Sequence, residues 1–363
     1  MNCFILIKSF TRLHSISSTG WIRKCKARLA RLKPKVVRLA QESEMYASAR
    51  QRTDPTKVLV AVLDKNDNRA LIGISKNALI WNTRALNFVS LDVSGSVSCS
   101  FMLEYQDGYI MIGNTEISMR SKDGKKLWTF NRANISTRIK DVALVGTCLY
   151  TLTKKGQLLE YHLDQIDQMP YFEDNMTKII STDAYAILYS TTAAADLMYL
   201  TSPDTSDTID LMNSKGKILI QMPYKFHSDR CGTQIGKYIV LALATEPNNQ
   251  KFEQAIYLIR QDGKLLWKST ETLTLKKSKT IVAIKGFKCA KHYYLTLEHT
   301  SHTLGLSIIN GNRVIGIGII TVDTPHARLP SSYVDCHVSA RSYRGVDMLI
   351  LTSDSIMTCS LSL

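Results

Sequence analysis

The chain has 363 residues and a formal net charge of +15, with 45% hydrophobic and 21% charged residues. This composition is ordinary for a folded globular protein, and the length suits one large domain with a smaller extension. No apolar run approaches the roughly 18 residues that a membrane-spanning helix needs, so we expect no transmembrane segment.

The first 20 residues are rich in Ser, Thr and basic residues and contain no acid. Their apolar stretch, residues 4–7, is too short for a secretory signal peptide. The composition is typical of a mitochondrial transit peptide, but a disordered polar terminus fits it equally well. Both interpretations stay open at this point.

Residues 21–50 have the pattern of an amphipathic helix, because apolar residues recur at spacings of three and four. Pro34 should kink or split this helix. Residues 1–56 hold 12 Lys and Arg against three acids, Glu42, Glu44 and Asp54. We therefore predict that residues 1–56 are a basic N-terminal arm, part disordered and part amphipathic α-helix.

A basic amphipathic helix can dock on a partner protein, lie on an anionic membrane surface or bind nucleic acid. It can also pack on the chain's own domain with its charges solvated. Aromatic residues that would stack on bases are scarce within residues 21–40, which favours a protein partner. The predicted partner-binding residues are Arg23, Lys24, Lys26, Arg28, Leu29, Arg31, Leu32, Lys33, Lys35 and Arg38.

A turn-and-strand motif repeats in residues 57–363. Its clearest copies are residues 121–130 and 260–269, where Asp-Gly separates two alternating apolar runs and a Trp follows four residues after the Gly. Asp-Gly in this setting indicates a β-hairpin, because Gly supplies the positive φ that the turn needs. The equivalent positions in all copies are Trp81, Trp128, Ile220, Trp267 and Ile315.

These positions lie 47, 92, 47 and 48 residues apart, and the interval of 92 leaves room for a degenerate copy near residue 171. A period of this length, filled with strands, predicts a β-propeller. We predict an all-β fold in which residues 57–363 form a single β-propeller of about seven four-stranded blades, with six as the alternative. The last blade lacks its own outer strand, and we expect an N-terminal strand such as residues 58–63 to complete it.

The two copies with an intact Asp-Gly-Lys-x-Leu-Trp resemble the blades of quinoprotein-type propellers, which carry pyrroloquinoline quinone repeats. This resemblance implies that Trp128 and Trp267 dock one blade on the next and are structural. Enzymes of that family use calcium-binding acids and often an adjacent pair of cysteines. No residue of this chain matches those features, so the resemblance extends to the blade and not to the cofactor site.

The sequence contains no nucleophile elbow, phosphate-binding loop or His-Glu-x-x-His motif. The eight cysteines are spread out without a Cys-x-x-Cys, which favours reduced structural thiols in an intracellular compartment, cytoplasmic or mitochondrial. We predict no catalytic residue, cofactor or metal, and a non-catalytic scaffold that binds a protein partner or multiprotein assembly. The alternatives are a quinone-dependent dehydrogenase and a nucleic-acid-associated propeller protein.

Overall fold

The structure is a computed structural model, and it describes the strands, some of the connections between them and a short helical segment. The described residues are 26–27, 35–38, 58–64, 69–74, 77–82, 87–89, 99–106, 108–113, 116–121, 125–131, 138–164, 177–190, 196–201, 208–222, 232–248, 251–274, 281–289, 292–299, 303–321, 333–342, 345–352 and 355–362. Within these ranges no helix is both long enough and apolar enough to span a membrane.

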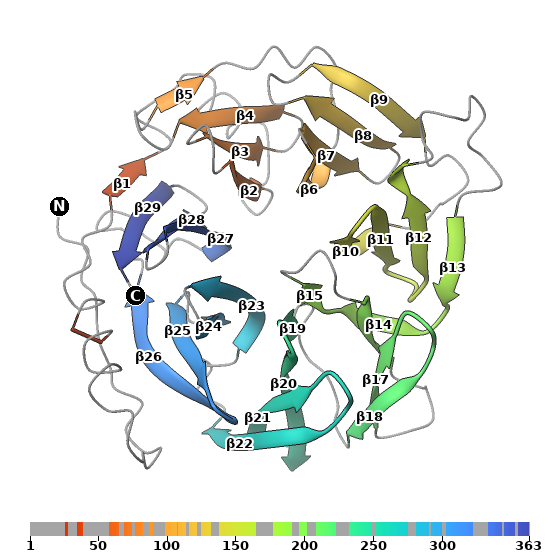
Figure 1. The fold of residues 1–363 in the computed structure, drawn as a ribbon, viewed down its shortest axis with the longest axis vertical. Coiled ribbons are helices and arrows are strands. Elements are labelled where there is room, and N and C mark those ends of the chain that lie inside the picture. Colours follow the sequence, from red (N-terminus) through yellow and green to blue (C-terminus); the bar gives the residue numbers. More distant parts are fainter. Residues whose placement is uncertain are drawn as a thin grey trace. The chain divides into compact units, whose positions relative to one another are not determined.

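The described strands form seven sheets, six of four strands and one of five, in which neighbouring strands are antiparallel with a single parallel exception (Figure 1). This confirms the expected all-β fold built from four-stranded antiparallel sheets. The chain divides into two compact units, the first comprising Met1–Ile5, Gly20–Ser136 and Thr321–Leu363, and the second Leu6–Thr19 and Thr137–Ile320. That the sheets are seven blades of one propeller stays a prediction.

The first unit contains three sheets. Strand β2 lies beside β27 of one neighbouring sheet and beside β6 of the other. The first sheet consists of β1 (Lys35–Arg38), β29 (Ser355–Ser362), β28 (Gly345–Thr352) and β27 (Tyr333–Ser342). The second consists of β2 (Val58–Asp64), β3 (Arg69–Ile74), β4 (Asn77–Asn82) and β5 (Asn87–Val89). The third consists of β6 (Cys99–Tyr105), β7 (Gly108–Gly113), β8 (Glu116–Ser121) and β9 (Lys126–Asn131).

The second unit contains four sheets. The first consists of β10 (Ile139–Val145), β11 (Cys148–Thr153), β12 (Leu158–His162) and β13 (Thr177–Ser181). The second consists of β14 (Ala184–Ile187), β16 (Met198–Thr201), β17 (Ile209–Asn213) and β18 (Ile218–Met222). The third consists of β15 (Tyr189–Ser190), β19 (Gly232–Ile235), β20 (Tyr238–Asn248), β21 (Lys251–Arg260) and β22 (Leu265–Thr274). The fourth consists of β23 (Ile281–Cys289), β24 (His292–His299), β25 (Thr303–Asn310) and β26 (Arg313–Thr321).

The core of the second unit lies between successive sheets. One hydrophobic cluster joins its first and second sheets, another its second and third, and another its third and fourth. Strand β20 shows why its sequence is a continuous apolar run. Ile239, Leu241 and Leu243 enter one cluster while Val240 and Ala242 enter the next, so both faces of the strand are buried.

The helix expected over residues 21–50 is wrong for Lys35–Arg38, which form strand β1 and pair antiparallel with β29. Pro34 stands directly before this strand, and the β-branched Val36 and Val37 favour extended backbone. Lys26 and Ala27 are helical. The rest of the expected helix lies outside the described residues.

The N-terminal strand that completes the C-terminal sheet was predicted in the wrong segment. Residues from the two ends of the chain do share a sheet, since β1 supplies its fourth strand. The expected strand at residues 58–63 exists as β2, but it begins a sheet of its own. The limit of the arm at residue 56 stays a prediction, because residues 39–57 lie outside the described part of the chain.

The repeat predicted the strands well and their order in the sheet less well. Trp128, Ile220, Trp267 and Ile315 all lie on the last strand of their sheets. Trp81 lies instead on β4, the third strand, and β5 follows it. The outer strand expected near residue 171 is β13, which begins at Thr177.

Trp267 is half-buried and packs against the cluster between the third and fourth sheets of the second unit, which supports a structural role. We predict that Trp267→Ala lowers the free energy of unfolding by about 2–4 kcal/mol, at or slightly below the range for a core aromatic. Denaturant titration measures this loss. Leu265→Ala on the same strand is the control, because Leu265 is 43% exposed and should cost far less. Equal losses would contradict the packing.

The pairing of β1 with β29 also has a direct test. Val36 and Met357 are register partners, so Val36→Cys with Met357→Cys should form a disulfide under mild oxidation. Val37→Cys with Met357→Cys is the control, since adjacent strand residues point to opposite faces. Mass spectrometry of the cross-linked peptides measures both yields. Similar yields for the two pairs would show that β1 is not held in this register.

Candidate functional site

Most of the predicted partner-binding residues lie outside the described part of the chain. Lys26 is half-buried in a helical segment, and Lys35 and Arg38 lie at the two ends of β1. The structure thus brings Lys35 and Arg38 to the edge strand of a sheet. It does not test the grouping of Arg23, Lys24, Arg28, Leu29, Arg31, Leu32 and Lys33 with them.

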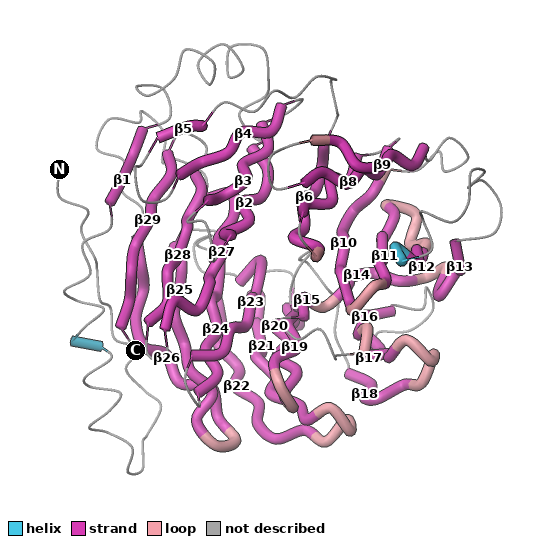
Figure 2. Tube along the Cα trace, turned by 45° about the horizontal axis from the view of Figure 1, so that its top comes forward, coloured by secondary structure: helices cyan, strands magenta, loops and turns pink. Residues whose placement is uncertain are grey.

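A second candidate site is a group of hairpin turns in the second unit. The turns joining β17 to β18, β21 to β22 and β25 to β26 are pink loops near the labels β18, β22 and β26 in Figure 2. Each contains a Gly of the sequence repeat with positive φ: 73° at Gly216, 89° at Gly263 and 59° at Gly311. This confirms the hairpin interpretation of those three copies.

Hydrogen bonds between residues close in sequence fix the conformation of these turns. The Asn213 side chain accepts hydrogen bonds from the backbone N–H groups of Lys215 and Lys217, at 3.1 and 3.0 Å. Asp262 does the same for the N–H of Lys264 at 3.1 Å. Asn and Asp favour turns because their short side chains can bond the backbone in this way.

The turns also contact one another. The Gln261 N–H donates to the Lys237 carbonyl at 3.1 Å, and its side chain donates to the Gly236 carbonyl at 2.8 Å. The Tyr238 hydroxyl donates to the Gly311 carbonyl at 3.4 Å, and Gly263 lies against the Leu219 backbone. We call this group the turn surface. It comprises residues 213–217, 236–237, 260–264 and 310–313, together with Lys288.

The turn surface is strongly basic. Asp262 is its one acid, and that carboxylate is paired with Arg260, which donates from Nε at 2.8 Å. The hydrogen bonds from Arg260 and from the Lys264 N–H lower the pKa of Asp262 to about 2. The negative charge of Asp262 and the positive charge of Arg260 therefore balance each other. The remaining basic side chains are all exposed. They are Lys215, Lys217, Lys237, Lys264, Lys288 and Arg313.

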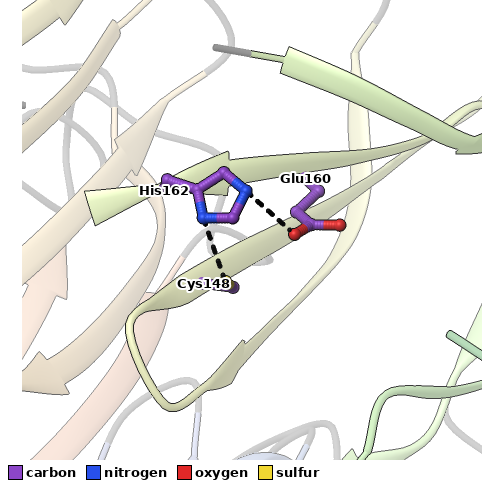
Figure 3. Close-up of side chains that lie close together, drawn as sticks. All are labelled: Cys148, Glu160 and His162. Atoms are coloured by element: carbon purple, nitrogen blue, oxygen red, sulfur yellow. Dashed lines mark hydrogen bonds and ion pairs between the residues drawn. The ribbon is translucent and has the colours of Figure 1, made fainter. Parts of the chain in front are cut away.

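A third group of side chains lies on the first sheet of the second unit. Among the described residues, Cys148, Glu160 and His162 are the one set of three that could hold a metal ion (Figure 3). The Cys148 Sγ lies 3.5 Å from His162 Nδ1, and His162 Nε2 lies 3.1 Å from Glu160 Oε1. Sequence reasoning missed this group, because Cys148 lies 12 residues before Glu160 and 14 before His162, and no linear motif joins them.

Burial raises the pKa of the Cys148 thiol, and the Glu160 carboxylate raises it further. Burial likewise raises the pKa of the Tyr150 phenol, with Glu160 and Cys148 adding to it. Cys148 and Cys289, the two cysteines whose side chains the structure describes, are free thiols.

No protein-family profile matches the sequence, and no curated protein sequence matches it either. Solved structures do match the fold. The chain is similar to the WD40 domain of Neurospora crassa Pan2, with a TM-score of 0.54, 10% identity and coverage of 84% of this chain and 88% of that one. It is similar to the β-propeller domain of Myceliophteria thermophila Cps50 (Swd1), with a TM-score of 0.52, 9% identity and coverage of 84% and 97%. The fold is that of a β-propeller.

A chain in the crystal structure of a mitotic checkpoint complex is also similar, with a TM-score of 0.59, 9% identity and coverage of 96% of this chain and 98% of that one. At these identities the likeness shows the fold alone. The likeness to quinoprotein-type repeats stays a prediction, since no family match supports it.

The fit of the propeller's turns against one another predicts different costs for two glycines. Gly216→Ala meets no neighbouring atom and should cost about 1–2 kcal/mol, because an L-residue is strained at positive φ. Gly263→Ala has the same strain, and its methyl group also overlaps the Leu219 carbonyl oxygen. We predict an additional loss of at least about 1 kcal/mol there. Denaturant titration measures the difference, and equal costs would show that the β21–β22 turn does not abut β18.

Proposed function

We propose that this propeller is a non-catalytic interaction scaffold and that its turn surface binds an acidic segment of a partner protein. The observation that carries the proposal is the set of six exposed Lys and Arg side chains at or beside hairpin turns, among which the β19–β20, β21–β22 and β25–β26 turns are linked by hydrogen bonds. Loops on a rigid scaffold are where partners commonly bind. A surface with a single sign of charge attracts partners of the opposite sign and speeds their association.

The solved structures agree with this class of function. The similar chains include a WD40 domain and a propeller domain, and another is a chain of a mitotic checkpoint complex. Function must be argued from the site and not from the fold. The basic turn surface supplies that argument here.

The aromatic side chains at the turn surface favour protein over nucleic acid. Tyr238 and Tyr293 form an edge-to-face pair with ring centroids 5.8 Å apart, and Tyr238 is only 8% exposed. Tyr293 packs against Gly236. Because these rings already pack on each other and on the chain, they are poorly placed to stack on bases, as single-stranded nucleic acid binding requires.

Residues 1–56 provide a further contact in this proposal. The basic and apolar residues between Arg23 and Arg38 bind the same partner or a neighbouring component of its assembly. The apolar side chains Leu29 and Leu32 would enter a groove on that component, while the Lys and Arg side chains would lie at its rim.

We predict that Lys237→Glu with Lys264→Glu reduces recovery of the partner from nuclease-treated cell extract by about tenfold or more, because like charges face each other across the interface. The control is Lys154→Glu with Lys155→Glu, which changes the charge equally at the exposed β11–β12 turn. Quantitative mass spectrometry of the retained proteins compares both variants with the unmodified chain.

The same measurement, made with the double variant Leu29→Ser and Leu32→Ser, tests whether the apolar side chains of the arm contribute to binding. Proteins that are lost with the turn variant and kept with the control identify partners of the turn surface. Recovery that is equal for both charge variants would place the interface elsewhere. Recovery that vanishes after nuclease treatment, or binding with a steep log-linear dependence on salt, would favour a nucleic-acid partner.

A further inference from the structure

Cys148, Glu160 and His162 come together through the register of one hairpin. Cys148 on β11 is paired with His162 on β12, and Tyr150, two residues after Cys148, is paired with Glu160, two residues before His162. Residues paired across two strands share a face, and so do residues two apart on one strand. The thiol, the imidazole, the carboxylate and the Tyr150 phenol therefore lie on one face of the sheet.

We propose that Cys148 and His162 bind a zinc ion and that Glu160 holds the imidazole ring in place. In a tetrahedral zinc site the Zn–S bond is about 2.3 Å and the Zn–N bond about 2.0 Å, which separates the two ligand atoms by roughly 3.5 Å. Cys148 Sγ and His162 Nδ1 are 3.5 Å apart. The two strands thus present a sulfur and a nitrogen at the separation that a shared zinc ion requires, without rearrangement of the backbone.

Glu160 occupies the place of the carboxylate that commonly supports a zinc-binding histidine. His162 Nε2 faces Glu160 Oε1 at 3.1 Å, on the side of the ring away from the sulfur. An imidazole that donates its Nε2–H to a carboxylate keeps Nδ1 free for a metal and becomes a better ligand. Glu160 is the more buried partner, with an 11% exposed side chain against 37% for His162. The carboxylate is therefore well placed to fix the orientation of the ring.

The chemistry of these donors selects zinc over magnesium or calcium. A thiolate and an imidazole are softer ligands than the oxygen atoms that the alkaline-earth ions prefer. The His162 side chain is partly exposed, so water can occupy the remaining coordination positions of the zinc ion.

The same three residues also resemble a thiol nucleophile with its base and an orienting acid. A nucleophilic cysteine is favoured beside positive charge, whereas Cys148 shares its face of the sheet with the Glu160 carboxylate. Zinc binding suits this setting, because the positive ion balances the charge of the thiolate.

The test uses the full-length purified chain, stripped of metal with a chelator under reducing conditions and then titrated with zinc in competition with a chromophoric chelator. We expect a site for one zinc ion that is lost in Cys148→Ser and in His162→Ala. Glu160→Gln should weaken it about 10- to 100-fold. Cys289→Ser is the matched control, because Cys289 is also a free thiol and lies on a different sheet.

Two readouts separate metal binding from loss of fold. Zinc should raise the melting temperature of the unmodified chain and of Cys289→Ser but not that of Cys148→Ser, since an ion that binds only the folded state stabilises it. Cobalt in place of zinc should give a thiolate charge-transfer band that Cys148→Ser removes.

Zinc binding of equal strength in the unmodified chain and in Cys148→Ser would overturn the proposal, as would no binding at all. Alkylation of Cys148 in the metal-free chain that slows in His162→Ala would assign the group to nucleophilic chemistry instead. None of these measurements depends on the partner of the turn surface, so the two proposals fail or succeed separately.

Discussion

Burial of the sheets on both faces is the constraint on which the second unit depends. Along β20, alternate side chains enter different clusters, so the strand is apolar at successive positions and lacks a solvent face. A polar side chain buried between neighbouring sheets is stabilised there by hydrogen bonds. Gln254 shows how, because its buried amide donates to the Ile281 carbonyl at 2.9 Å and accepts from the Ile281 N–H at 2.8 Å. One side chain thereby attaches the start of β23 to the preceding sheet.

This double burial leaves the ends of the strands and the outermost strands to carry function. The turn surface lies at hairpin turns, and Cys148 directly follows the turn that joins β10 to β11. Both candidate sites therefore depend on sheets whose centres are rigid and whose ends are open to solvent. The exposed apolar side chains follow the same rule, since Leu127, Ile179, Ile218 and Leu265 all lie on the last strands of their sheets.

The strands and glycine turns could be predicted from sequence because their signals are local. Gly216 and Gly263 hold positive φ in turns of two to four residues, and the apolar alternation on either side follows directly. The place of each copy within its sheet could not be predicted in the same way. Trp81 shares the local pattern of Trp128 but lies on the third strand of its sheet and not the fourth, because a local turn motif does not specify which strands of the sheet it joins.

The cross-strand group and β1 show two further limits of reading a sequence linearly. Cys148, Glu160 and His162 form no motif, yet the turn around Gly156 fixes which residues of β11 and β12 oppose each other. Counting outward along both strands from that turn is enough to pair Cys148 with His162. Lys35–Arg38 is the harder case, because its helical pattern is genuine. The apolar spacing is helical, but Val36 and Val37 favour extended backbone, and the open edge of β29 offers a ladder of backbone hydrogen bonds that a helix following Pro34 would leave unpaired, so strand pairing prevails over the spacing.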